Sequence, residues 1–306
     1  MKAFLSLFIC LLCISPMIQA QVGINTDGSQ PDPTAILDVK SNVKGFLPPR
    51  MTTAERNSIQ SPAEGLLVFN TTTGCIDYFL GGSWKSLGGA TEPAFQCGMK
   101  MTDPRDGQHY NTVKIGTQCW MAQNLNTGTQ IDAATEQVSN PVVEKYCYHN
   151  LASNCDVFGG LYQWGEAVNY LNNSSNASSW NPVPAGVVTG ICPPGWHLPS
   201  SNEWNDLATV LGGLSFAGGK MKEPGTSQWS SPNTGADNAS GFTAKPAGVY
   251  NRSTGFTGLG QGTWLWSATE TYSAGAESWW IDYNYEFLSP DNTDKPGGLA
   301  VRCVMD

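Results

Sequence analysis

Apolar positions along the chain gather in short runs between turn residues, a pattern typical of β-strands. In residues 21–87 the runs ILDV, GLLVFN and CIDYFL are strand-like, and the pair Gly81-Gly82 before SW predicts a tight turn. One short helix is expected over 53–59. A segment of about 70 residues with such short runs buries little apolar surface alone, so we expect it to pack against an identical chain or the C-terminal domain.

The stretch GGATEPAFQ over 88–96 is a predicted linker to a larger domain at 97–306. Residues 97–119 predict a β-hairpin, because TDPRDG supplies a turn and HYNTVKIG alternates in the manner of a strand. Strand-like pieces recur after Trp229, separated by loops rich in Gly, Asn and Ser: GFTAKPAGVYN, TWLWSATE, ESWWIDYNYE and LAVRCV.

Two helices are predicted between the hairpin and these late strands. The first covers 158–171, where apolar residues recur three or four positions apart: Leu161, Trp164, Val168 and Leu171. The second follows Ser200, which can cap it, and Glu203 completes a capping box. Its apolar face consists of Trp204, Leu207, Ala208 and Leu211, and Gly212-Gly213 ends it. This order of elements predicts an α+β domain.

The first twenty residues have the pattern of a secretory signal peptide. Lys2 gives a positive start, an apolar run reaches Ile14, and Ala20 is the small residue that signal peptidase needs. The run is shorter than the ~20 residues that span a bilayer. We therefore assign 1–20 to a signal peptide and expect an exported protein at the outer surface or outside the cell, with the periplasm as an alternative. Lipoprotein processing at Cys10 or Cys13 is the other alternative.

Composition and charge limit the classes of molecule that this protein is expected to bind. Charged residues make up 13% of the chain, about half of the ~25% typical of globular proteins, and the net charge is −9. A low charge content together with 34 Gly and 11 Trp suits an exported β-rich protein. The acidic balance argues against nucleic acid or an anionic membrane surface as partner, since both attract basic patches.

The cysteines outside the signal peptide are first candidates for disulfides in an oxidising compartment. None of them forms a CxxC pair, so a zinc site is not expected. The hairpin would bring Cys97 close to Cys119, and Cys147 and Cys155 flank a loop short enough to close locally.

The stretch GICPPGWHLPSSNEW over 190–204 places Cys192 near His197, which suggests a metal site or a thiol nucleophile with its base. The alternative is mechanical, because an oxidised Cys192 has no thiolate and leaves His197 to pack in a turn. His109 and His149 lie far away in the chain and without HExxH spacing. A GxSxG elbow and a GK[ST] phosphate loop are both missing, so we expect no catalytic residue and no enzyme.

Two family resemblances follow from longer motifs. Residues 97–306 resemble the Fibrobacter succinogenes major paralogous domain family through TDPRDGQHYNTVKIGTQCWMAQNL (102–125), CYHNLASNCDVFGGLYQWGEA (147–167), ICPPGWHLPSSNEWNDL (191–207), GFTAKPAG (241–248), LWSATE (265–270) and LAVRCVMD (299–306). Residues 21–87 are similar to tail-fibre-like modules of exported Bacteroidetes proteins through VGINT (22–26), LDV (37–39), KGFLPPRMT (44–52) and PAEGLLVFNTTTG (62–74).

The first resemblance implies a C-type-lectin-like fold, with two helices and a mostly antiparallel sheet, that is shared with formylglycine-generating enzymes. It also implies a bridge from Cys192 to Cys303, because such folds commonly link a cysteine before the second helix to the final strand. The second implies a small β-rich stalk module that forms homotrimers through residues 21–87. Related modules carry another cysteine after the tryptophan where this chain has WKSLGG, which leaves Cys75 free or intermolecular.

These observations predict a non-catalytic adhesion or binding protein whose ligand is a glycan or another protein. A structural subunit of a surface fibre or layer is the second interpretation. An oxidase related to formylglycine-generating enzymes is the third, and every cysteine of the domain has a disulfide partner that would remove the reactive thiol.

The predicted binding residues lie on the loops and strands between Gly213 and Lys295. They are outward-facing aromatic residues and oxygen donors: Trp264, Trp280, Tyr283, Asp291, Asn292 and Asp294. The last three offer oxygen ligands of the type that calcium takes, although such runs are more often solvated turns. The EPN tripeptide of calcium-dependent lectins is replaced by EPG at 223–225. No other cofactor is expected.

Overall fold

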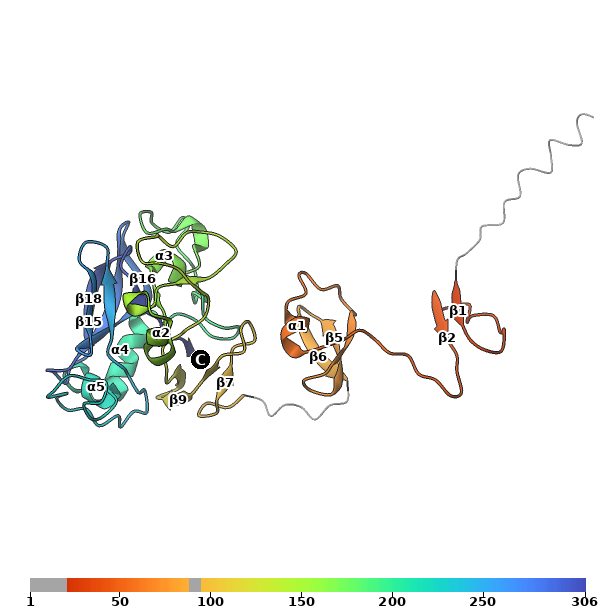
Figure 1. Cartoon of the computed structure of the whole chain (residues 1–306), viewed down its shortest axis with the longest axis horizontal. Coiled ribbons are helices and arrows are strands. Elements are labelled where there is room, and N and C mark those ends of the chain that lie inside the picture. Colours follow the sequence, from red (N-terminus) through yellow and green to blue (C-terminus); the bar gives the residue numbers. More distant parts are fainter. Residues whose placement is uncertain (1–20, 88–94) are drawn as a thin grey trace, which may run out of the picture.

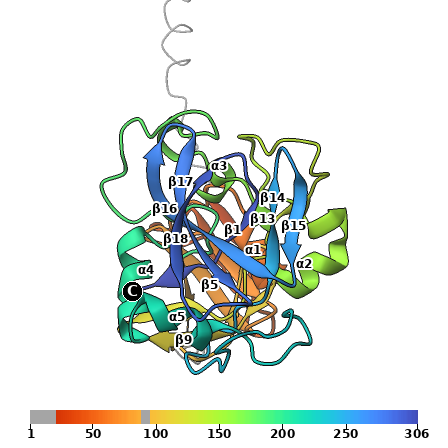
Figure 2. The same ribbon diagram turned by 90° about the vertical axis from the view of Figure 1, so that its left-hand side faces the viewer.

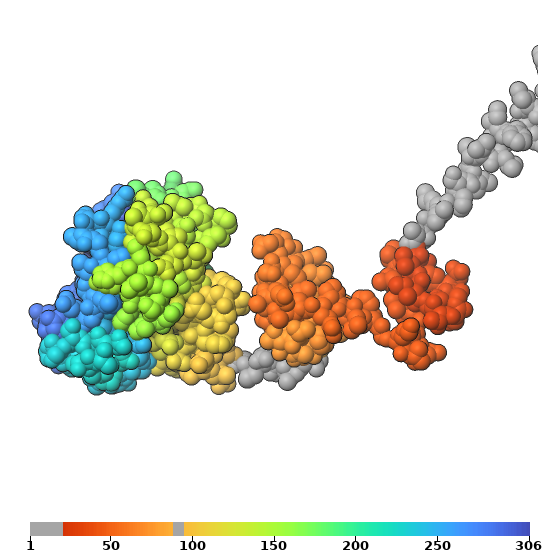
Figure 3. All heavy atoms as spheres, in the orientation of Figure 1, coloured from red at the N-terminus to blue at the C-terminus, as the bar shows by residue number. Residues whose placement is uncertain are grey.

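The computed structural model describes residues 21–87 and 95–306, which form three bodies joined along the chain (Figures 1 and 3). The predicted signal peptide at 1–20 lies outside the described residues, as does most of the predicted linker at 88–96. Within the described residues, no helix has the length and the apolar character needed to cross a membrane.

The two N-terminal bodies are small and β-rich. The first is a parallel pair of strands, β1 (Val22–Ile24) and β2 (Leu37–Val39). The second is a four-stranded sheet with one helix, made of β3 (Arg50–Met51), α1 (Thr53–Asn57), β4 (Leu67–Asn70), β5 (Cys75–Leu80) and β6 (Ser83–Leu87). The three strand-like runs and the short helix of the sequence analysis correspond to β2, β4, β5 and α1.

Polar groups occupy much of the interior of the second body. Asp77 is fully buried and accepts hydrogen bonds from Asn70, at 2.8 Å, and from Ser86, and it forms an ion pair with Arg56. Val68 is the one large apolar side chain below 9% exposure among the described residues 21–87. This body therefore has almost no apolar core of its own.

The third body, residues 95–306, is the head. Its main sheet consists of β13 (Leu161–Tyr162), β14 (Ala247–Asn251), β15 (Gly255–Leu259), β16 (Gly262–Tyr272), β17 (Gly275–Asp282), β18 (Ser289–Asp294) and β19 (Leu299–Ala300). The strand order is β13-β19-β16-β14-β15, while β17 pairs with β16 and β18 with β17. Figure 2 shows β16, β17 and β18 beside one another, and β14 beside β15. Most of the ladders are antiparallel, and the pairings of β16 with β14 and β19 are parallel.

Smaller elements surround the main sheet. A three-stranded sheet contains β9 (Thr112–Ile115), β10 (Gln118–Met121) and β20 (Val304–Met305). Two-stranded pairs are formed by β7 (Met101–Thr102) with β8 (His109–Tyr110), and by β11 (Thr129–Gln130) with β12 (Glu144–Lys145). The helical segments are η1 (Tyr148–Asn150), α2 (Ala152–Phe158), α3 (Trp164–Ala167), η2 (Leu171–Asn173), α4 (Ser201–Val210) and α5 (Leu214–Met221). The mixture of helices and sheets agrees with the predicted α+β class.

The predicted second helix is α4. Ser200 is its N-cap, and the capping box with Glu203 is complete in both directions. The four residues of the predicted apolar face are all buried in one core cluster. The helix ends at Val210 with Leu211 as its C-cap, and both glycines that follow have positive φ. Helix α5 begins directly after them and was not predicted.

The prediction of one helix over 158–171 is wrong. The chain there forms the end of α2, strand β13, the four-residue α3 and η2. Gly159, with φ of 84°, ends α2, and the apolar spacing then continues through a strand. Leu161 and Trp164 are nevertheless buried, because β13 and α3 place them against the two core clusters.

Two further elements differ from expectation. Residues 97–119 form two hairpins instead of one, because the pairing breaks after Tyr110, and β9 turns back onto β10. The segment SPDNTD over 289–294 is the edge strand β18 and not a turn. Polar residues are frequent on edge strands, where one face and one edge contact water, so their composition resembles that of a loop.

Three disulfides brace the head. They are Cys97–Cys119, Cys147–Cys155 and Cys192–Cys303, the pairings expected from the sequence, and Cys75 is the free cysteine of the described residues. The third closes a sequence separation of 111 residues, for which the chain-entropy relation gives about 5 kcal/mol. It ties the approach to α4 to the last strands of the chain.

Candidate functional site

Two paired strands place a pair of tryptophans side by side on the main sheet. Trp264 of β16 lies opposite Trp280 of β17, and their rings stack with centroids 6.3 Å apart and planes at 15°. Phe287 meets the ring of Trp280 edge-on at 5.1 Å, and Tyr285 stacks on Phe287 at 4.7 Å. We call these four side chains the aromatic row. The first three are half-buried and Tyr285 is 50% exposed.

Strand alternation explains why these tryptophans are accessible while their neighbours are not. Leu265 and Trp279, which pair across the same two strands, point to the opposite face and are fully buried. Trp266 shares a face with Trp264, but it is covered and donates its indole N–H to the carbonyl of Tyr162 at 2.7 Å. Other parts of the head therefore bury this face of the sheet at Trp266, and at Trp264 they leave it partly exposed.

Two glycines make room for the ring of Trp264. A Cβ added at Gly262 would lie 2.9 Å from Cζ3 of that ring, and one at Gly258 would lie 3.2 Å from it. Both distances are too short for comfortable van der Waals contact, and Gly258 also has φ of 79°. The indole thus lies directly against the backbone of β15 and β16.

A buried lysine fixes the loop that carries the rest of the aromatic row. Lys222 follows α5, is fully buried, and donates to the carbonyl oxygens of Thr234 at 2.7 Å, Asp282 at 3.0 Å and Tyr285 at 2.8 Å. Its ammonium also lies over the ring of Trp229, 5.6 Å from the centroid. Three carbonyl dipoles replace the water that the cation has lost, and they tie residues 282–285 to the end of α5.

The remaining predicted binding residues do not join the aromatic row. Tyr283 is partly buried against the main core cluster, as Trp264 is against the second, but none of the aromatic contacts in the described residues joins Tyr283 to the row. On β18, Asp291 pairs with Ser278 while Asn292 pairs with Glu277, so alternation places Asp291 on the face opposite Asn292 and Asp294. Asn292 accepts a hydrogen bond from Thr271, and Asp294 accepts one from Tyr272 at 3.2 Å. These three oxygen donors do not converge on one calcium position.

The stretch around Cys192 has a mechanical role in the structure. Cys192 is bonded to Cys303, and His197 pairs through its backbone with Val304. The His197 side chain is 5% exposed, and its Nε2 lies 2.6 Å from Oε1 of Glu203. Burial raises the pKa of Glu203, but hydrogen bonds from His197 and Ser200 outweigh it and lower the pKa to about 2.

His197, Glu203 and Asp306 form the one group of three metal-ligand types within mutual reach among the described residues. The amide nitrogen of Gln118 donates to Oε1 of Glu203 at 2.8 Å and to Oδ1 of Asp306 at 3.1 Å. An N–H donor thus already lies between the two carboxylates. The geometry is that of a hydrogen-bonded network linking α4, β10 and the C-terminus.

Sequence reasoning missed Phe287 and Lys222. Phe287 follows the end of β17, and nothing in the local pattern shows that the chain turns back onto Trp280. Lys222 resembles an ordinary surface lysine in sequence, because lysine is rarely fully buried. Its carbonyl partners come from residues 12 to 63 positions away.

The titration of Lys222 provides a test of its burial among the three carbonyl oxygens of Thr234, Asp282 and Tyr285, which we call the carbonyl cage. Burial lowers the pKa of its ammonium to about 8, below the ~10.4 of an unfolded lysine. The unfolded chain therefore binds more protons between these values, so Lys222 makes the protein more stable as pH rises from 8 towards 10. The free energy of unfolding, minus that of Lys222→Met, should increase by about 1 kcal/mol per pH unit above pH 8.

The measurement is urea unfolding of both chains at pH 7.5 to 9.5, in a Cys75→Ser background that prevents thiol–disulfide exchange. Subtracting the variant removes the contributions of other titrating groups. A difference that stays flat across this range would place the pKa of Lys222 at its ordinary value and contradict the prediction that burial destabilises its charged form.

Comparison with known proteins agrees with both parts of the chain. Residues 113–305 match the family model of the Fibrobacter succinogenes major domain, and residues 23–101 match that of a phage tail like trimerisation region. No curated protein and no solved structure matches the chain. Together with the three disulfides, these matches indicate an exported protein of surface or fibre-like type. The chain belongs to the Fibrobacter succinogenes major domain family.

Proposed function

We propose that this protein is a trimeric, non-catalytic surface adhesin whose head binds glycan through the aromatic row. Residues 21–87 form the trimeric stalk, and the head is a C-type-lectin-like domain. The signal peptide at 1–20 directs export to the outer surface. The observation that carries the proposal is the half-buried stack of Trp264 and Trp280, extended by Phe287 and the exposed Tyr285.

The aromatic row has the properties of a sugar platform. Flat indole faces pack against the C–H faces of pyranose rings, and the phenol of Tyr285 adds a hydrogen-bonding group at the exposed end. Asp282 lies two residues after Trp280 on β17, so strand alternation places it on the same face, where its carboxylate can accept from sugar hydroxyls. The backbone at Gly258 and Gly262 supports the ring of Trp264, and the hydrogen bonds of Lys222 hold residues 282–285. The aromatic rings are therefore in place before a ligand binds, which reduces the entropy lost on binding.

The N-terminal bodies support self-association. Their exposed apolar residues include Val43 at 87%, Ile36 at 78% and Leu47 at 76%, whereas Val68 is their one buried large apolar side chain in the described residues. Apolar side chains this exposed are available for contact with a partner, and such a contact would remove them from water. The match of residues 23–101 to a trimerisation region favours two further copies of this chain as the partner.

Trimerisation is tested by the mass of the chain in solution. Light scattering should give about three times the chain mass, and Val43→Asp should reduce it to that of one chain because a charge enters the apolar contact. The matched control is Val183→Asp, since Val183 is equally apolar and 72% exposed but lies on the head. A monomer in the unmodified chain, or equal loss in both variants, would contradict the trimeric stalk.

Glycan binding is tested on an array with the unmodified chain. We expect retention of a glycan, and Trp264→Ala and Trp280→Ala should each weaken it by about tenfold or more, as removal of a stacking aromatic side chain does. Tyr272→Ala is the matched control, because Tyr272 is a 47% exposed aromatic residue on β16 outside the aromatic row. Binding of no glycan by a trimeric chain would favour the alternative of a structural fibre subunit.

A further inference from the structure

Arg302 is a buried cation without an acidic partner. Its side chain is 1% exposed, and the guanidinium donates to Oδ1 of Asn124, at 3.0 and 2.8 Å, and to the carbonyl oxygens of Met121 and Phe242. All of these acceptors are neutral, and they occupy four of the five N–H groups that a guanidinium carries. Among the described residues no carboxylate forms an ion pair with Arg302.

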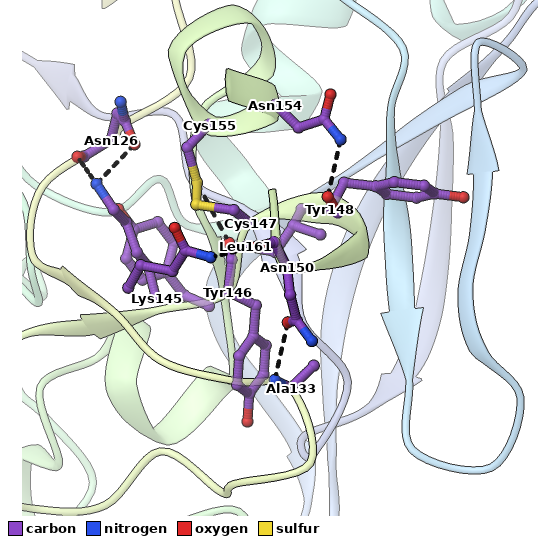
Figure 4. Close-up of a disulfide and its surroundings, with 12 residues drawn as sticks. Asn126, Ala133, Lys145, Tyr146, Cys147, Tyr148, Asn150, Asn154, Cys155 and Leu161 are labelled. Carbon is purple, nitrogen blue, oxygen red and sulfur yellow. Dashed lines mark hydrogen bonds between the residues drawn. A yellow bond between two sulfur atoms is a disulfide. The ribbon is translucent and has the colours of Figure 1, made fainter. Parts of the chain in front are cut away.

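Arg302 lines a pocket of about 120 Å³ in the head. The other walls come from β8, the chain after β10, the end of α2 and the segment before β14. The disulfide between Cys147 and Cys155 holds α2 in place, and Asn126 on the neighbouring wall accepts a hydrogen bond from Lys145 at 2.7 Å (Figure 4). This pocket shares no lining residue with the aromatic row.

Several donor groups on the lining have no partner among the described residues. Lys245 is half-buried, and in the described part of the chain its ammonium has neither an ion pair nor a hydrogen bond. Gln123 accepts from the backbone of Asn111 and Asn126 accepts from Lys145, so the amide N–H groups of both remain available. His109 shares a hydrogen bond with Thr102 through Nδ1, and its Nε2 donates in the tautomer in which Nδ1 accepts. Such a donor set matches an anion rich in acceptors.

Asp156 also lines this pocket and limits the charge of that anion. A dianion such as phosphate would meet repulsion from its carboxylate, whereas hydroxyl groups of a ligand would donate to it. A monoanion that carries both a carboxylate and hydroxyl groups satisfies both sides. Because a carboxylate accepts paired hydrogen bonds from cationic donors, it would accept from the ammonium of Lys245 and from the one guanidinium N–H of Arg302 that has no partner among the described residues.

We propose that this pocket binds the carboxylate end of a hydroxylated monocarboxylate, the chemistry of a uronic acid. The carboxylate lies between Arg302 and Lys245, and the ring hydroxyls meet Asp156 and the amides of the rim. The pocket is a second binding site of the head, separate from the proposed glycan platform.

The test is isothermal titration of the exported chain with glucuronate, with glucose as the neutral counterpart and sulfate as an inorganic anion. The test variant is Lys245→Ala, because the ammonium of Lys245 has no bond within the described chain whose loss would unfold the head. Lys114→Ala is the matched control, since Lys114 is exposed on β9 and the same charge is removed away from the pocket. Circular dichroism verifies that both variants fold.

We expect glucuronate to bind at least about tenfold more tightly than glucose, since one charge-assisted contact is worth about that factor. Lys245→Ala should weaken glucuronate binding by about tenfold, and Lys114→Ala should leave it unchanged. Equal binding of glucose and glucuronate, no binding of glucuronate, or equal effects of the two variants would each overturn the proposal. Tighter binding of sulfate than of glucuronate would also overturn it, by assigning the pocket to inorganic oxyanions.

Discussion

Cations buried among backbone carbonyl oxygens hold the long loops of the head in place. Lys222 joins the end of α5 to residues 234 and 282–285, and Lys295 joins residues 178 and 273 through their carbonyls while it pairs with Glu270. Both ammonium groups are fully buried. A buried charge without such partners would cost several kcal/mol, so the loops cannot leave these cations without a large penalty.

The aromatic row depends on this constraint. Trp264 and Trp280 are placed by the pairing of β16 with β17, but Tyr285 and Phe287 belong to a loop that has no strand partner of its own. The hydrogen bond from Lys222 to the carbonyl of Tyr285 anchors that loop beside Trp280. The disulfides connect segments that are far apart in the chain, because Cys192–Cys303 joins the segment before α4 to the last strands. A rigid base with fixed loops is the arrangement that binding proteins commonly use.

Local signals in the sequence predicted the elements whose causes are local. The capping box of Ser200 and Glu203 and the glycine pair after Leu211 determine α4 almost alone, and the alternation in TWLW and SWWIDY predicts β16 and β17. The error over 158–171 arose because Gly159 interrupts an apolar spacing that fits a helix equally well. The residues of β18 are polar, and they form a strand because they pair with β17. The local sequence contains no pattern that predicts this pairing. The carbonyl partners of Lys222 and Arg302 are equally invisible, since they depend on contacts between distant segments.

Amide hydrogen exchange over residues 282–287 tests most directly whether Lys222 fixes this loop. In Lys222→Met, exchange across these residues should accelerate relative to the unmodified chain, because three buried carbonyl oxygens lose their donor and the loop opens locally. Exchange in α4 should stay the same, since its capping box and core contacts are untouched. Unchanged exchange over 282–287 in a folded variant would contradict the central role of the buried cation.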